Sequence, residues 1–272
     1  MNDTTRGPSP FGERLRGWRR RAGWSQLALA TRAGTTARHL SFLETGRSRP
    51  GEELVLRLGR ALDLPLRERN ALLVAAGLPP RYREAKLDEP SLAPISQVID
   101  RVLAQHEPFP AWAFARGLRP IVANTAAELL FPGLTAMTPE SIVDMWFGPG
   151  PFREMVENWR AVSAAGLDSL RRDAAAASDP SVDALVRRAE AHLGEVDDVP
   201  IDSSFPVVCP RFRVGDRVVR TVSAVLRFDT AADVTASELR VELMFPADEP
   251  SAAFFRSLAL PSPGIATAGA PR

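Results

Sequence analysis

Apolar residues recur at helical spacing through about the first eighty residues of the chain. Between residues 11 and 22 the apolar positions are separated by four, three and four residues, which predicts a helix with one buried face. Two shorter amphipathic helices are predicted between residues 24 and 50, and two more before Pro79-Pro80. Five helices in so short a stretch would pack into a compact all-α bundle with a core of its own.

The pattern between residues 24 and 50 indicates two short helices joined by a tight turn. Ser25 stands at an N-cap position before the first of these helices, and Gly34 stands where that helix must stop and turn. Thr35 or Thr36 can cap the second helix. A helix–turn–helix of this length places its second helix in the major groove of DNA, but spacing alone leaves an ordinary αα-hairpin open as the alternative.

The side chains exposed on the second helix of this pair are the candidates for contact with bases. Arg38 is the strongest of them, because a guanidinium can form two hydrogen bonds with guanine O6 and N7, whereas Ala37 or Phe42 could contact a thymine methyl group. Arg47 and Arg49 lie just past the helix and suit contacts with phosphates. The complete set of predicted DNA-binding residues is Gln26, Thr35, Thr36, Ala37, Arg38, His39, Ser41, Phe42, Arg47 and Arg49.

The charge distribution favours the DNA-binding alternative. The whole chain has a net charge of only +1, but residues 1–83 carry 16 Arg and 7 acidic residues, a net charge of +9. The remaining residues carry 18 Lys or Arg and 26 Asp or Glu, a net charge of −8. A basic module attached to an acidic one is the pattern expected when the first part binds a polyanion.

After residue 80 the apolar pattern changes its period. Residues 81–94 are polar and bounded by prolines, which predicts a linker between a first domain at 11–80 and a second domain at 95–258. Helices are predicted at 95–106, 126–131, 139–147, 152–165, 169–177 and 181–192, and strands at 110–115, 120–123, 205–214, 218–228 and 239–245. This order indicates an α+β domain with an antiparallel sheet of about five strands and helices covering one face. Residues 1–10 and 259–272 are predicted to be disordered.

Other classes of protein are excluded by residues that the sequence lacks. Cys209 is the only cysteine, so no intramolecular disulfide and no cysteine-based zinc cluster is possible. His39, His106 and His192 lack the spacing of a metal site, and no nucleophile elbow or dinucleotide fingerprint is present, so we expect no metal, no cofactor and no catalysis. No run approaches the ~18 apolar residues that span a bilayer, and the first ten residues lack the apolar core of a secretory signal, which predicts a cytoplasmic protein without a membrane partner.

Three stretches of the first domain carry a family resemblance: S-Q-x-x-L-A-x-x-A-G, R-H-L-S-F-L-E-T-G-R-S-R-P and L-G-R-A-L-D-L-P. Over residues 11–76 the chain resembles the lambda-repressor-like (XRE, Cro/C1-type) DNA-binding domain. The resemblance implies a bacterial, nucleoid-associated regulator that binds double-stranded DNA, and an ion pair between Glu44 of the recognition helix and Arg19 of the first helix. The Gln-type base readers of that family are replaced here, so its operator sequence does not carry over. Because one such module covers only a half-site, we expect a homodimer.

The second domain contains W-A-F-A-R-G-L-R-P-I-V-A-N-T-A-A-E-L-L-F, V-E-N-W at 156–159, R-R-D-A-A-A from Arg171, and E-L-M-F-P-A-D-E-P-S. In these stretches it is similar to the effector domain of MmyB-like transcription regulators, which has a PAS-like fold. The similarity implies a cavity for a small apolar, fatty-acid-like ligand, although most of the large aromatic residues are expected to be core. The candidate ligand residues are Trp112, Phe114, Trp146, Phe147 and Trp159, with Arg171 or Arg172 to pair with a carboxylate head group.

Two hypotheses of function remain open at the level of sequence. In the first, the protein is a sequence-specific DNA-binding transcription regulator whose promoter binding is modulated by a small apolar ligand in the C-terminal domain. In the second, the C-terminal domain is a protein-interaction or dimerisation module, and its apolar interior is only core.

Overall fold

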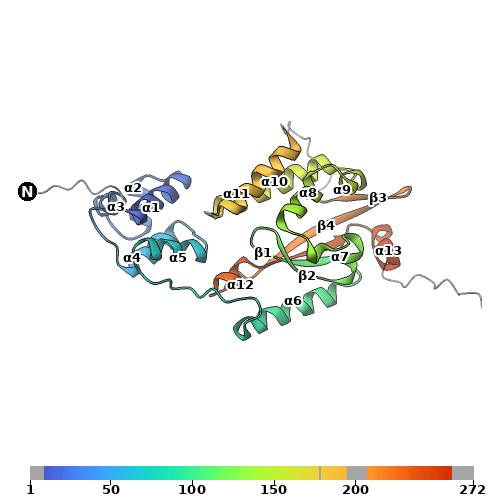
Figure 1. Cartoon of the computed structure of the whole chain (residues 1–272), viewed down its shortest axis with the longest axis horizontal. Helices are drawn as coiled ribbons and strands as arrows, with labels where there is room; N and C mark the ends of the chain where they lie inside the picture. Colours follow the sequence, from blue (N-terminus) through green and yellow to red (C-terminus); the bar gives the residue numbers. More distant parts are fainter. Residues whose placement is uncertain (1–8, 178, 195–206, 259–272) are drawn as a thin grey trace, which may run out of the picture. The chain divides into compact units, whose positions relative to one another are not determined.

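The structure is a computed structural model that describes residues 9–177, 179–194 and 207–258. Within these residues the chain forms two compact units (Figure 1). The disorder predicted for 1–8 and 259–272, and the start of the strand predicted at 205–214, lie outside the described residues. Ser9 and Pro10 were predicted to belong to a disordered N-terminus, but they form the cap and the first turn of a helix.

The N-terminal unit contains the predicted bundle of five helices, which is confirmed. Its helices are α1 (Pro10–Arg21), α2 (Gln26–Arg32), α3 (Ala37–Glu44), α4 (Glu52–Ala61) and α5 (Leu66–Ala75). The core is built largely from leucines that have no exposed surface, among them Leu15, Leu29, Leu40, Leu58 and Leu72. The helical spacing of these leucines in the sequence therefore reports directly on the buried face of each helix.

Hydroxyl side chains fix where three of these helices begin. Ser9, Ser25 and Thr36 each accept a hydrogen bond at 3.1 Å from the backbone N–H three residues later, which satisfies a donor that the helix itself leaves unpaired. Gly34 has a φ of 63° and makes the sharp turn between α2 and α3, a conformation that other residues adopt at a cost. The caps and the turn together set the direction in which α3 leaves α2.

The segment 81–94, predicted as a linker, is held at several points. Asn70 Oδ1 accepts hydrogen bonds at 2.9 Å from two successive backbone N–H groups of this segment. The N-terminal unit also includes residues 229–237, where Asp233 Oδ2 accepts a hydrogen bond at 3.0 Å from the backbone N–H of Ala85. The first part of the segment is thus packed against its own unit rather than running free.

The C-terminal unit is built around a five-stranded antiparallel sheet with the strand order β2-β1-β5-β4-β3. Its strands are β1 (Ala111–Ala115), β2 (Arg119–Ala123), β3 (Arg211–Val214), β4 (Arg217–Arg227) and β5 (Arg240–Pro246). The helical segments are η1 (Pro90–Leu92), α6 (Ala93–His106), α7 (Thr125–Leu130), η2 (Leu134–Ala136), α8 (Pro139–Phe147), α9 (Pro151–Met155), α10 (Trp159–Ala176), α11 (Pro180–Leu193) and α13 (Glu249–Leu258), whereas α12 (Val234–Glu238) lies almost wholly in residues 229–237 of the N-terminal unit. The predicted α+β domain with five antiparallel strands is confirmed.

Both faces of the sheet are covered, which corrects the prediction that helices cover only one. The inner face, defined here as the face that carries Trp112, Val219 and Met244, packs against aromatic and aliphatic side chains of α7, α8, α9 and α10. The opposite face carries Ala111 and Val241 and packs against α6, which lies across it in Figure 1. A small alanine on this face lets the helix approach the sheet closely.

The observed helices differ from the predicted ones in three further respects. The helices predicted at 152–165 and 169–177 are replaced by the short α9 and one continuous α10. Gly166 remains inside α10 because a Cβ at this position would lie 3.2 Å from Trp146 Nε1, so the glycine serves packing rather than a break. The helices α12 and α13 were not predicted, although Ala252, Phe255 and Leu258 of α13 recur at helical spacing.

Asn124 joins three elements of the C-terminal unit through its buried side chain. Its Oδ1 accepts hydrogen bonds from the backbone N–H of Ala111 at 2.9 Å, at the start of β1, and of Ala127 at 3.0 Å, in the first turn of α7. Its Nδ2 donates to the carbonyl of Phe109 at 2.7 Å. The side chain is only 6 % exposed, so each of these backbone groups would otherwise lack a partner in the interior.

Replacing Asn124 by alanine is expected to destabilise the C-terminal unit by about 2–4 kcal/mol, because it removes a helix cap and leaves buried polar groups unpaired. Urea unfolding followed by circular dichroism measures the loss. Thr138→Ala is the matched control, because it removes an N-cap bond to Ser141 that is exposed, and it should cost no more than about 1 kcal/mol. Equal losses for the two variants would contradict the role given to Asn124.

Candidate nucleic-acid interface and ligand domain

Helix α3 crosses α1 at a very short distance. A Cβ built on Gly12 would lie 2.7 Å from the carbonyl oxygens of both Leu43 and Glu44, closer than real Cβ atoms come to backbone. The backbone of α3 therefore touches the backbone of α1 at a position that only glycine permits. This contact brings the side chain of Glu44 against the basic residues of α1.

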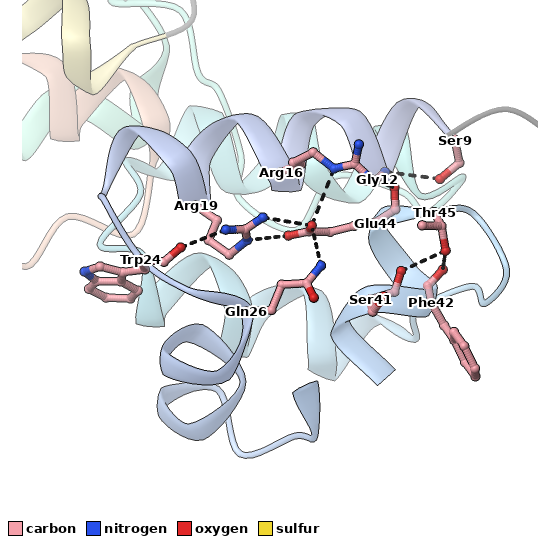
Figure 2. A network of polar contacts seen from close by, with 10 residues as sticks. All are labelled: Ser9, Gly12, Arg16, Arg19, Trp24, Gln26, Ser41, Phe42, Glu44 and Thr45. Atoms are coloured by element: carbon pink, nitrogen blue, oxygen red, sulfur yellow. Dashed lines mark hydrogen bonds and ion pairs between the residues drawn. The ribbon is translucent and has the colours of Figure 1, made fainter. Parts of the chain in front are cut away.

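Glu44 is the centre of a buried network of polar contacts, drawn in Figure 2. Its side chain has no exposed surface and accepts hydrogen bonds from Arg19 Nε at 2.6 Å and Arg19 Nη2 at 3.0 Å. Gln26 Nε2 donates to it at 2.9 Å, and Arg16 Nε lies 3.5 Å from Oε2. One carboxylate on α3 thus binds two side chains of α1 and the first residue of α2.

The charges in this network stabilise one another. Burial acts to raise the pKa of Glu44, but the hydrogen bonds from Arg19 and Gln26 and the charges of Arg19 and Arg16 outweigh it, so the pKa lies below its usual value. The hydrogen bond to Glu44 raises the pKa of Arg19 in turn. Arg19 Nη1 also donates to the carbonyl of Trp24 at 2.7 Å. The predicted pair of Glu44 and Arg19 is present, and Arg19 has a structural role.

The outward face of α3 carries the residues predicted to contact bases. Arg38 is exposed, and its guanidinium carbon lies 5.4 Å from the centre of the Phe42 ring, an arrangement that directs the long side chain along the helix surface. Ala37 and Ser41 are half-buried, as is Phe42. Leu40, on the other side of the helix, is fully buried. The predicted reading residues therefore lie on the side of α3 that faces away from the core.

Arg47 and Arg49 follow α3 and are exposed. Within residues 9–177, 179–194 and 207–258, neither these two arginines nor Arg38 has an acidic side chain within ion-pair distance. Guanidinium groups without internal partners are available to phosphate oxygens or to guanine. This availability distinguishes them from Arg16 and Arg19, which are bound to Glu44.

Other members of the predicted DNA-binding set have bonds inside the unit. His39 Nδ1 lies 3.3 Å from Thr35 Oγ1, and His39 Nε2 lies 3.4 Å from Ser48 Oγ. Thr36 caps α3, and Gln26 belongs to the Glu44 network. These four predicted residues position α3 and the segment after it, and their direct contact with DNA stays a prediction. The contact of Ser48 with the second ring nitrogen of His39 was not predicted from the sequence.

In the C-terminal unit, four of the predicted ligand residues belong to one aromatic cluster at the inner face. Trp112 is 3 % exposed, and Phe114 lies two residues further along β1 on the same face. Trp146 stacks on Phe152 with ring centres 4.5 Å apart, and Trp159 Nε1 donates to the carbonyl of Trp146 at 3.0 Å. These contacts make a wall that is mostly packed core, as aromatic residues in such a domain usually are.

The remaining predicted ligand residues lie elsewhere. Phe147 packs in a separate cluster formed by α8, α10 and α11. Arg171 is exposed and binds Glu190, with 2.8 Å between Nη2 and Oε1, and its Nη1 lies 3.6 Å from Asp168. Arg172 is exposed as well. The structure therefore does not bring either arginine together with the buried aromatics, and the predicted pairing with a ligand carboxylate has no geometric support.

Trp159 also lines a surface cleft of about 520 Å³. The guanidinium carbon of Arg153 stacks 4.2 Å from the centre of its ring, and Glu157 and Arg213 contribute charged groups to the lining. A cleft that is open to water and lined by charges differs from the enclosed, mainly apolar sites that hold small apolar molecules.

The two units match two known families. Residues 95–258 match the MmyB-like transcription regulator ligand binding domain, and residues 10–72 match a helix-turn-helix domain. The chain belongs to the MmyB-like transcription regulators. A comparison with curated proteins found no match.

As a member of this family, the protein is a helix–turn–helix DNA-binding transcription regulator with an MmyB-like ligand-binding domain, and neither match is to a catalytic family. The matched segment 10–72 contains α2 and α3, the two helices that the sequence predicts as the helix–turn–helix pair. No helix among the described residues is long and apolar enough to cross a membrane. The same residues contain no group of three or more His, Cys, Asp or Glu side chains placed to hold a metal ion.

Glu44→Gln is expected to destabilise the N-terminal unit by about 3 kcal/mol at pH 7, because it leaves Arg19 buried against a neutral partner. The pKa of Glu44 is lowered in the folded protein, so its contribution is present above the unfolded value of about 4.3 and is lost as the pH falls through the folded-state pKa. The difference between wild type and variant should therefore shrink in acid. Urea unfolding at pH 7 and at lower pH measures both effects.

Glu53→Gln is the matched control for this prediction. Glu53 is 85 % exposed and its Oε1 lies 3.7 Å from Arg57 Nη1, so losing this pair should cost at most about 1 kcal/mol at either pH. A loss in Glu44→Gln no larger than that of the control would show that the buried network does not hold α1, α2 and α3 together.

Proposed function

We propose that the protein binds a promoter through the outward face of α3 and that a small, largely apolar ligand in the C-terminal domain modulates this binding. The observation that carries the proposal is the presence, in one chain, of a helix–turn–helix domain and an MmyB-like ligand-binding domain. The exposed guanidinium groups of Arg38, Arg47 and Arg49 supply the positive charge that DNA requires.

The positions of the three arginines predict different kinds of contact with DNA. Arg38 lies in the first turn of α3, the part of a recognition helix that reaches base edges, and a bidentate contact with guanine would make it selective. Arg47 and Arg49 lie beyond the end of α3, where contacts with phosphates would orient the unit without selecting a sequence.

The regulatory step is a shift between two arrangements of a homodimer. One helix–turn–helix unit covers a half-site, and a dimer reads two half-sites ~34–36 Å apart. A ligand that binds one arrangement more tightly than the other shifts the population toward it, and with it the half-site spacing that the dimer can span. The fatty-acid-like ligand expected from the family resemblance is one candidate, and the apolar wall of Trp112 and Phe114 supports its hydrocarbon part.

Arg38→Ala is expected to relax the preference for one base pair of the operator, losing about 1–3 kcal/mol on the specific site and little on random DNA. Arg47→Ala is expected to weaken both DNAs about equally and to reduce the slope of log affinity against log salt by about 0.9. Fluorescence anisotropy on an operator taken from a genome-wide footprint, with scrambled DNA as the control, measures both. Equal losses on the two DNAs for Arg38→Ala would remove it from base reading.

Ligand dependence is tested by screening apolar metabolites and fatty acids for a rise in melting temperature of the full chain. A ligand at a hundred times its Kd that binds only the folded state should add about 2.7 kcal/mol of stability. The same ligand should change operator affinity severalfold. Stabilisation without any change in operator affinity would rule out modulation, and a regulator bound only by a partner protein would show no stabilisation by any of these compounds.

A further inference from the structure

The strand pairing places three side chains with polar groups next to one another on the inner face of the sheet. Trp112 on β1 is directly opposite Glu242 on β5, and Ser223 on β4 is opposite Met244. Glu242 and Met244 are two residues apart, so Ser223 is the diagonal neighbour of Glu242 on the same face. Directly opposite Cβ atoms are about 4.5–5.5 Å apart and diagonal neighbours about 7–8 Å, which makes these three a polar subsite.

Two members of the polar subsite are buried without a hydrogen-bond partner. Trp112 Nε1 and Ser223 Oγ are two of only three buried side-chain nitrogen or oxygen atoms that lack one among the described residues. The side chain of Trp112 is 3 % exposed, so water at the surface does not satisfy it. More than nine in ten buried polar groups in proteins are paired, so two adjacent exceptions on one face indicate a missing partner.

The third member is the carboxyl group of Glu242, which is strongly desolvated although part of the residue remains accessible. Part of the surface of Glu242 is accessible, but desolvation raises the pKa of its carboxyl group to about 7. Only the nearby Ser223 hydroxyl acts to lower this pKa, and that hydroxyl makes no hydrogen bond of normal geometry. Val225, directly opposite Glu242 on β4, is 52 % exposed. The inner face is therefore not fully covered beside Glu242.

Among the described residues, no cationic side chain pairs with Glu242. Arg240 follows the same face of β5, but both of its terminal nitrogens bind the Asp173 carboxylate of α10. A neighbouring guanidinium would lower the pKa of Glu242, and none contributes to it. The polar subsite therefore offers an indole N–H donor, a hydroxyl and a carboxyl group that accepts hydrogen bonds without a positive partner.

We propose that Trp112, Ser223 and Glu242 form the polar end of the ligand site and that they bind a hydroxyl or amino group rather than a carboxylate. A hydroxyl can donate to Glu242 while it accepts from Trp112 or Ser223, and an ammonium group also neutralises the charge of Glu242. Above a pH of about 7, where Glu242 is ionised, a carboxylate would meet a like charge in a poorly hydrated place, which is unfavourable. This inference rests on the proposed ligand function and replaces the predicted head-group contact with Arg171 or Arg172.

Three probes with the same ten-carbon chain test the proposal on the full chain at about pH 8, above the pKa of about 7 for Glu242: 1-decanol, decylamine and sodium decanoate, each below its aggregation limit. Melting temperature and tryptophan fluorescence give the affinities. Decanol and decylamine should bind at least about tenfold more tightly than decanoate, the margin expected for hydrogen bonds to a charged group. In Glu242→Gln the advantage of decylamine over decanoate should fall to less than about threefold, because the carboxylate that discriminates is gone.

Asp216→Asn is the matched control, because it removes one acidic group from the exposed turn between β3 and β4 and should leave the ranking of the probes unchanged. Ser223→Ala is a second variant that keeps the charge and should weaken decanol about fivefold or more through the lost hydroxyl. It keeps the test decisive if Glu242→Gln does not fold.

The outcomes separate the inference from the proposed function. Decanoate binding as tightly as the other two probes in the wild type, or a probe ranking that survives both Glu242→Gln and Ser223→Ala, would overturn the polar subsite while leaving a ligand domain. No change in melting temperature with any of the three probes would count against the ligand function itself, and with it against the inference.

Discussion

A single buried carboxylate holds the DNA-binding unit in its working shape. Glu44 ends α3 and binds side chains of α1 and α2, so the three helices share one fixed charge rather than only an apolar core. Gly12 makes this possible because a larger residue would separate the backbones of α1 and α3. An ion pair without exposure is expensive to break, so the outward face of α3 is presented rigidly. The placement of the exposed arginines on α3 and just after it thus depends on a fully buried residue.

At the inner face of the sheet in the C-terminal unit, polar groups are left unpaired rather than paired. Among the described residues, Trp112 Nε1 and Ser223 Oγ have no hydrogen-bond partner of normal geometry, and they lie near the strongly desolvated carboxyl group of Glu242, which costs stability. A compound that supplies the missing partners gains more from binding than it would from an already satisfied site. Under the proposed function, the unpaired groups thus make the C-terminal unit responsive to a ligand. The paired Glu44 instead keeps the DNA-binding unit in one conformation.

The elements could be predicted from sequence more completely than the sites. Caps such as Ser25 and Thr36 and the helical spacing of leucines act locally, so their positions follow from the chain itself. The continuity of α10 through Gly166 was not predicted, because the close packing of this glycine on Trp146 depends on a residue twenty positions away. Glu242 was missed for a similar reason, since one glutamate in an alternating strand usually faces water and only the sheet register places it opposite a buried tryptophan.

The central claim is that α3, held by Glu44, reads the major groove through Arg38. Dimethyl sulfate footprinting of the operator at saturating protein tests it directly, because the reagent methylates guanine N7 in that groove. The account predicts that a guanine in each half-site is protected by the wild-type protein and becomes reactive in the complex with Arg38→Ala, while the rest of the footprint is kept. An identical pattern of guanine reactivity in the two complexes would contradict it.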